Sequence, residues 1–126
     1  MKQEFKHLKV VEIASVLAGP SVGLFFAEMG AQVIKIENKR TGGDVTRSWK
    51  LPTEDKNARI SAYYSSVNWH KQSIFMDFTA ADDQKQLNIH LQDADILIVN
   101  FKAGDAEKFR LDYPTIHALN PNLIYG

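Results

Sequence analysis

The stretch KVVEIASVLAGPSVGLFFAEMGAQVIKIE, residues 9–37, is the most informative part of the sequence for predicting the fold. It predicts a β-strand, an α-helix and a second β-strand: residues 9–14, 20–29 and 32–37. Pro20 suits the first turn of the helix because it has no N–H to leave unpaired, and Gly30 stands where a left-handed C-cap belongs. The predicted buried face of the helix consists of four apolar residues at helical spacing: Val22, Phe25, Phe26 and Met29. A βαβ unit of this kind places its first loop at the carboxyl edge of a parallel sheet, where α/β folds bind ligands.

The remaining chain continues the alternation of strands and helices. Further strands are expected at residues 73–77, 95–100 and 122–125, and helices at residues 80–92, 105–110 and 114–119. In the helix at 80–92, Thr79 is the expected N-cap, and Leu87 and Leu91 are the expected buried stripe. The pattern predicts an α/β fold with a doubly wound parallel sheet.

Residues 38–72 interrupt this alternation and are predicted to be a long loop insertion within a single unit that spans residues 1–126. Loops of this length in compact domains are usually functional or disordered. The aromatic residues Tyr63, Tyr64 and Trp69 indicate that the second half of the insertion is packed.

Composition narrows the classes of function. The chain has 126 residues, 15 basic and 15 acidic side chains and no cysteine. The balanced charge favours neither nucleic acid nor an anionic membrane, and the missing cysteines exclude disulfides and thiolate ligands. The N-terminal residues lack the apolar core of a signal peptide, and no apolar run reaches the length of a membrane span. We therefore expect a soluble, cytoplasmic protein.

The polar residues that follow the second predicted strand allow two interpretations each. Glu37 stands about 20 residues after the first loop, as a ribose-binding acid should, but the G-x-G-x-x-G motif is missing and a nicotinamide site is disfavoured. The segment 42–44 with Arg47 could bind phosphate through backbone N–H groups and a guanidinium. A turn with a solvated Arg47 is the favoured alternative.

Three lysines are predicted to lie at the same edge of the sheet as the first loop: Lys71, Lys102 and Lys108. They suit a polyphosphate ligand, and a solvated rim is equally compatible with their spacing. The four histidines share no metal-ligand spacing, so no metal site is predicted. No serine has a nucleophile-elbow setting and no carboxylate pair stands out, so no catalytic residue is predicted.

Several short segments, taken in order, are more specific than any one of them: VLAGP at 16–20, GAQVIKIE at 30–37, GDVTR at 43–47, Asn68 with KQS at 71–73, ADILIVNF at 94–101 and LNPNLIY at 119–125. Together they resemble the N-terminal part of the family III CoA-transferases. This family includes formyl-CoA transferase, carnitine CoA-transferase, bile-acid-inducible CoA-transferases and α-methylacyl-CoA racemase. The resemblance covers nearly the whole chain.

The resemblance implies a Rossmann-like large domain that binds CoA at the carboxyl ends of its strands, and a homodimer with interlocked subunits. Carried over position by position, it implies CoA binding by ten residues: Val16, Ala18, Arg40, Met76, Asp77, Phe78, Asn100, Phe101, Lys102 and Lys108. The chain departs from the family pattern at several positions. Asn38 replaces a usual Arg, Trp69-His70 replaces Arg-Gly, Ala103 replaces Pro, and Arg110 replaces Gly.

The resemblance also implies a reaction, the transfer of CoA between an acyl-CoA thioester and a small carboxylic acid. In the family an Asp nucleophile forms an acyl anhydride and then an aspartyl thioester. That Asp lies beyond the part of the family that this chain matches, so we expect an N-terminal fragment that is inactive alone. The alternatives are a non-catalytic CoA-binding or assembly module, and the matching half of an acyl-CoA racemase.

Overall fold

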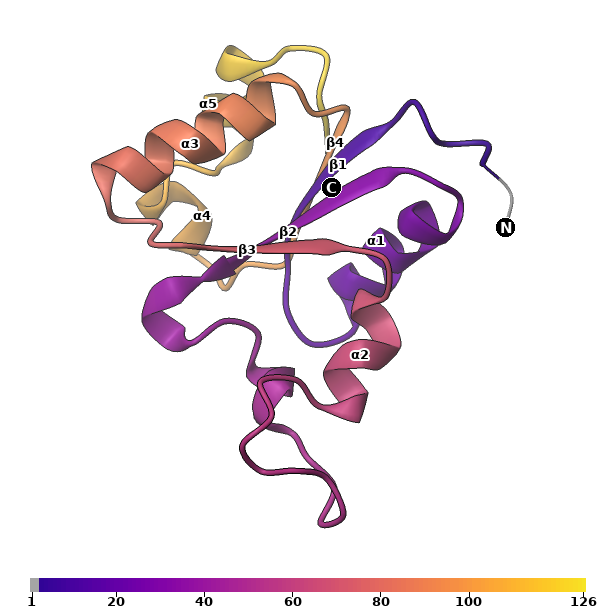
Figure 1. Cartoon of the computed structure of the whole chain (residues 1–126). Coiled ribbons are helices and arrows are strands. Elements are labelled where there is room, and N and C mark those ends of the chain that lie inside the picture. The colour runs from indigo at the N-terminus through magenta and orange to yellow at the C-terminus, as the bar shows by residue number, and fades with distance from the viewer. Residues whose placement is uncertain (1–2) are drawn as a thin grey trace.

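The computed structural model describes residues 3–126, which form a sheet between two layers of helices (Figure 1). Within this range five strands make one parallel sheet in the order β3-β2-β1-β4-β5. The strands are β1 Lys9–Ile13, β2 Gln32–Asn38, β3 Gln72–Met76, β4 Ile96–Val99 and β5 Ile124–Tyr125. The predicted doubly wound α/β fold is confirmed, and each strand lies within two residues of its predicted bounds.

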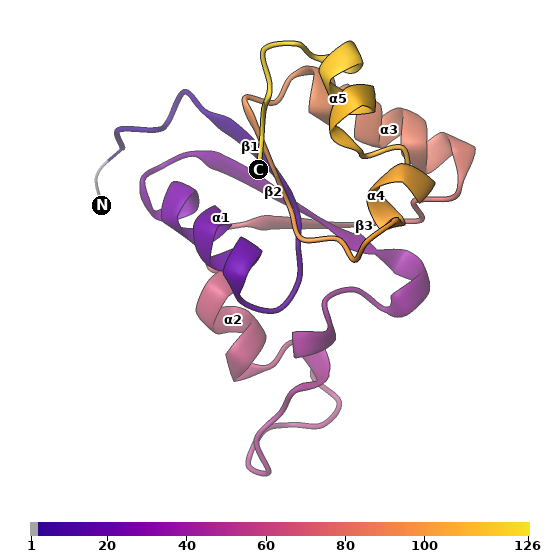
Figure 2. The same ribbon diagram turned by 180° about the vertical axis from the view of Figure 1, so that it is seen from behind.

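The helices cover both faces of the sheet (Figures 1 and 2). One face carries α1 Ala18–Glu28 and α2 Ala62–Asn68, and the other carries α3 Ala81–Gln92, α4 Asp105–Lys108 and α5 Tyr113–Leu119. The strand order changes direction between β1 and β4. Ligands of open α/β sheets bind at such a switch point, beyond the carboxyl ends of the strands.

Each face of the sheet has its own apolar core. Under α3 and α5 the core contains Leu87, Leu91 and Leu97, and the last two are completely buried. The predicted stripe of α3 is thereby confirmed. Under α1 the core is built from smaller side chains, such as Ala14, Ala27 and Val33.

The predicted buried face of α1 is wrong in part. Val22 and Phe25 are 47% and 54% exposed, and the buried residues of the helix are instead small: Gly19, Pro20, Gly23 and Ala27. The reason is close packing, because a Cβ on Gly23 would lie 1.8 Å from Oε2 of Glu12 on the sheet below. Gly30 follows the end of α1 with a φ of 95°, which confirms the left-handed conformation predicted for it.

The segment predicted as a long loop contains regular structure. It holds the 3-10 turns η1 Lys39–Thr41 and η2 Val45–Ser48 and the helix α2, and a loop between η2 and α2 projects from the body of the molecule (Figure 1). Tyr64 is buried, as expected, but Trp69 is 60% exposed. The side chain of Ser61 caps α2 by accepting a hydrogen bond from the Tyr64 N–H.

The predicted N-cap of α3 is also wrong. Ala80 takes the cap position, and Thr79 instead donates its N–H and hydroxyl to Oδ1 of Asp77 at 2.9 and 2.7 Å. This local turn competes with capping because Asp side chains readily bind the backbone two residues on. Within the described residues, the structure has no helix long and apolar enough to cross a membrane.

Candidate functional site

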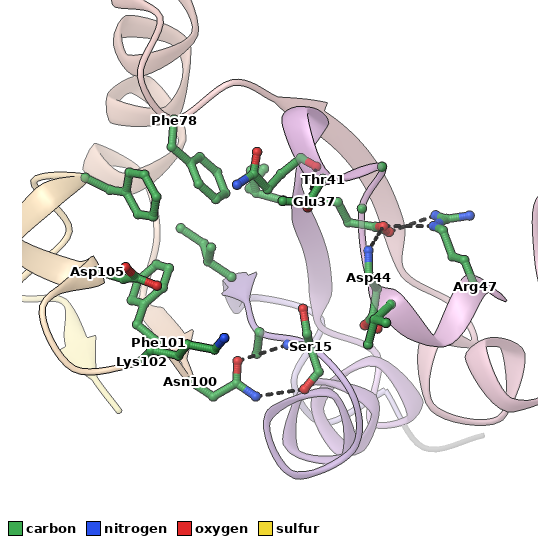
Figure 3. Close-up of a pocket in the computed structure, with 18 of the residues that line it drawn as sticks. Ser15, Glu37, Thr41, Asp44, Arg47, Phe78, Asn100, Phe101, Lys102 and Asp105 are labelled. Carbon is green, nitrogen blue, oxygen red and sulfur yellow. Dashed lines mark hydrogen bonds and ion pairs between the residues drawn. The ribbon is translucent and has the colours of Figure 1, made fainter. Parts of the chain in front are cut away.

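A cleft of about 530 Å³ opens at the carboxyl edge of the sheet, at the switch point between β1 and β4 (Figure 3). The residues just beyond β1, β2 and β4 form its walls. They include Ser15, Asn38, Thr41, Asn100, Phe101 and Lys102. Along one side, the ring of Phe109 packs against the rings of Phe78 and Phe101, with centroids 5.3 and 6.1 Å away. The lining of the cleft therefore combines an aromatic wall with several polar side chains.

Asn100 binds the first loop across the switch point. Its Oδ1 accepts the Ser15 N–H at 3.0 Å, and its Nδ2 donates to the Ser15 carbonyl oxygen at 2.7 Å (Figure 3). The side-chain amide therefore binds Ser15 as the backbone of a neighbouring strand would, at the point where β1 and β4 separate. Asn100 holds one wall of the cleft in place.

Glu37 lies at the centre of a buried polar cluster. Its carboxylate accepts from Nε and Nη2 of Arg47 at 2.8 and 2.7 Å, from the Tyr64 hydroxyl and the Ser73 hydroxyl, and from the backbone N–H of Asp44. Burial alone would raise the pKa of Glu37, but these hydrogen bonds, led by Arg47, outweigh it and lower the pKa to about 2. Glu37 is not available as a ribose-binding acid, which removes the feature that favoured a nicotinamide site.

Arg47 fits neither interpretation made from the sequence. Its side chain is 15% exposed and spans the Glu37 carboxylate, so it is neither solvated nor free to hold a phosphate. The guanidinium carbon lies 4.0 Å from the centre of the Tyr64 ring. Arg47 instead neutralises Glu37 in the lining of the cleft.

A second group of charges is buried beneath α1. Lys35 donates to Oε1 of Glu12 at 2.9 Å and lies 3.0 Å from Oδ2 of Asp44, and Lys71 lies 2.6 Å from Oε2 of Glu12. The prediction that Lys71 lies at the rim of a polyphosphate site is therefore wrong. Burial lowers the pKa of Lys71 against the opposing effect of Glu12.

The sequence itself could have predicted part of this buried group of charges. Glu12 and Lys35 each stand between two apolar residues within a strand, and the register of β1 and β2 makes them direct neighbours. Charged residues are rarely buried unless paired, so two opposite charges in adjacent parallel strands predict an ion pair.

A smaller pocket of about 260 Å³ adjoins the cleft and shares Asn38, Phe78 and Phe109 with it. Nη1 of Arg40 donates to the Thr79 hydroxyl at 3.0 Å, and the pocket is also lined by Lys108. Both cations are exposed to solvent.

Seven of the ten residues predicted to bind CoA line these two pockets: Arg40, Asp77, Phe78, Asn100, Phe101, Lys102 and Lys108. Val16 lies in the first loop and Ala18 at the start of α1, outside both linings, and Met76 is buried in the core. Phe109 lines both pockets and was missed, because an isolated Phe after a short helix carries no sequence signal. The binding roles stay predictions.

The structure is a Rossmann-like α/β domain with a cleft at the switch point of its sheet. The family model for CoA-transferase family III matches residues 5–126, and the chain belongs to this family. The chain is similar to a succinate–glutarate CoA-transferase of Agrobacterium fabrum, with 40% identity over 98% of this chain and 32% of the relative. It is also 32% identical to a formyl-CoA:oxalate CoA-transferase of Escherichia coli, over 100% of this chain and 29% of the relative.

A similar solved structure is that of a CAIB/BAIF family protein from Brucella suis. The TM-score is 0.84 at 42% identity, over 94% of this chain and 31% of the other. The chain spans about a third of the length of the curated relatives that it matches.

Proposed function

We propose that this chain binds the CoA part of a thioester at the carboxyl edge of its sheet, as a portion of an enzyme that moves CoA between an acyl-CoA and a carboxylic acid. The observation that carries the proposal is the pair of adjoining pockets. One has an aromatic wall and the other has two exposed cations, which suits a long ligand with apolar and polyphosphate parts. Family membership supplies the ligand class.

Each pocket has a defined role in this proposal. Arg40 and Lys108 bind phosphate oxygens through charge-assisted hydrogen bonds, with Lys102 at the mouth of the larger cleft. Phe78 and Phe101 shield the organic part of CoA from water. Val16 and Ala18 line the adenosine side, as the family resemblance implies.

The proposed nucleophile is an aspartate outside these 126 residues. Its carboxylate attacks the thioester carbonyl, giving an acyl anhydride and CoA thiolate, and the thiolate then forms an aspartyl thioester and releases the acyl carboxylate. The acceptor carboxylate then attacks the aspartyl thioester and releases CoA thiolate, which attacks the resulting anhydride to give the new acyl-CoA and the free aspartate. Asp44 does not suit this role because it is 2% exposed and paired with Lys35, and Asp77 is engaged with Thr79. The proposal includes a homodimer of the whole enzyme.

The test is a calorimetric titration of the chain with CoA at two salt concentrations. We expect R40M and K108M each to weaken binding by about tenfold and to reduce its salt dependence, because each removes one charge-assisted contact. The matched control is K85M, an exposed lysine on α3 that lines neither pocket.

Two results would count against the proposal. If K85M weakens binding as much as R40M, the affinity reflects charge in general and the smaller pocket has no special role. If the 126-residue chain alone exchanges CoA between a thioester and a carboxylate with ordinary turnover, the nucleophile lies within these residues.

A further inference from the structure

Val16 in the first loop has a backbone conformation that its side chain disfavours. Its φ is 72°, in the left-handed region. A β-branched residue there is a genuine outlier, and such strain persists only where the surrounding structure enforces it. The contacts of the loop identify what enforces it.

One side of the loop is held by Asn100, which pairs with both backbone groups of Ser15. The other side is held by a buried ion pair. Nζ of Lys35 donates to the Ala14 carbonyl oxygen at 2.7 Å, and Oδ1 of Asp44 accepts the Val16 N–H at 3.3 Å. Side chains from three other parts of the fold therefore bind consecutive backbone groups just before α1.

Asp44 is itself rigidly placed. Its Oδ1 also accepts the Thr46 N–H and hydroxyl at 3.0 and 2.8 Å, and its Oδ2 lies 3.0 Å from Nζ of Lys35. Its own N–H donates to Oε2 of Glu37 at 2.8 Å. Figure 3 labels Asp44 and Ser15 among the residues that line the cleft, and Asp44 contacts Val16, the residue that follows Ser15. An immobile carboxylate of this kind can impose a conformation on a neighbouring backbone.

We propose that Asp44 is a positioning residue for the CoA-binding cleft: its buried carboxylate, balanced by Lys35, holds Val16 in the left-handed conformation and so sets the shape of the first loop. Asp44 does not contact the ligand in this role. The link to CoA rests on the proposed function, whereas the effect on the loop is a property of the unliganded chain.

The experiment combines D44N with V16G. Glycine adopts a positive φ without strain, so it relieves the need for the constraint that Asp44 supplies. In D44N we expect amide exchange at Val16 to accelerate by about tenfold or more and CoA affinity to fall by about tenfold, from the loss of a charged acceptor. In V16G/D44N we expect affinity within about threefold of V16G.

T46V is the matched control. It removes the hydroxyl that bonds to the same oxygen of Asp44 but leaves the Val16 contact in place. Exchange at Val16 should change by less than about twofold in T46V, because the Val16 N–H keeps its acceptor. A general loosening of the core would accelerate exchange in T46V and D44N alike, which would overturn the proposal.

Other results also decide the matter. Unchanged exchange at Val16 in folded D44N, or an equal loss of affinity in both backgrounds, refutes the positioning role. If D44N does not fold, a folded V16G/D44N supports the role and an unfolded one refutes it. If the wild-type chain does not bind CoA, the proposed function fails, but the exchange measurements still decide what Asp44 does to the loop.

Discussion

The substitution Gly23→Ala tests how closely α1 approaches the buried charges. Gly23 lies on the buried side of α1, and a Cβ there would be 1.8 Å from Oε2 and 3.0 Å from Cδ of Glu12. It would also lie 3.2 Å from Nζ of Lys71. Helix propensity alone predicts that alanine stabilises this helix by about 1 kcal/mol. The structure predicts the opposite sign.

The magnitude follows from the contacts of Glu12. Its two carboxylate oxygens bind Lys35 at 2.9 Å and Lys71 at 2.6 Å, and the side chains of all three residues are at most 1% exposed. A Cβ on Gly23 would force Glu12 to withdraw from Lys71 or would push α1 off the sheet. Breaking a buried ion pair costs about 3–5 kcal/mol, so after the gain in propensity we expect a net loss of about 2–4 kcal/mol.

The assay is urea denaturation of the 126-residue chain, followed by circular dichroism, for wild type, G23A and S21A. Ser21 is exposed on the same helix, so S21A reports propensity without the clash and should be neutral or slightly stabilising. E12D/G23A, in which the carboxylate is withdrawn by one methylene, should recover part of the loss. A G23A chain as stable as S21A would show that α1 does not need glycine here, and the reasoning would be refuted.

Three further predictions concern stability. His70 and Arg110 have φ values of 60° and 58°, so H70G and R110G should each stabilise the chain by about 0.5–1 kcal/mol in urea denaturation. The pKa of Glu37 is lowered from 4.5 to about 2, so its ionised carboxylate should stabilise the folded chain by on the order of 3 kcal/mol. This contribution is complete above about pH 4.5 and is lost as the pH falls towards 2. E37Q should flatten this dependence of stability on pH. Leu91 is completely buried, so L91A should cost about 2–5 kcal/mol by chemical denaturation.

Each of these predictions has a control and an outcome that contradicts it. His117 is an exposed position within α5, so H117G should destabilise the chain by about 0.5 kcal/mol, because glycine has a lower helix propensity than histidine. A similar loss of stability in H70G would contradict the strain argument. Equal acid sensitivity of wild type and E37Q would show that Glu37 is not the titrating group. Ile89 lies on the exposed side of α3, so I89A should leave the free energy of unfolding nearly unchanged. A loss of stability in I89A equal to that in L91A would contradict the assignment of Leu91 to the core.

Local patterns in the sequence predicted most of the elements. The five strands are short apolar runs bounded by turn residues, and the stripe of Leu87 and Leu91 has helical spacing, so each can be recognised without its neighbours. The helix α2 was missed because it has only seven residues, too few to show a helical repeat of apolar side chains. Its start depends on Ser61, whose side chain is anchored to the Thr46 carbonyl oxygen from another part of the chain.

Two departures from the family pattern have a conformational meaning that only the structure supplies. His70 and Arg110 stand where the family usually has glycine, and both have positive φ. A positive φ is the conformation that glycine adopts most readily, so His70 and Arg110 make the backbone of this chain more strained at these two positions.

The alternation of strands and helices and the family could be read from the amino-acid sequence alone, because both depend on short segments in a fixed order. The same alternation placed the first loop at the carboxyl edge of the sheet, where the cleft opens. The buried face of α1 and the partners of the charged residues could be known only from the folded chain. Glu12, Lys35, Asp44 and Lys71 are far apart in the chain and meet only when the sheet assembles. Once buried, each charge must be paired, so the folded contacts, and not local propensity, determine which groups are free to bind a ligand.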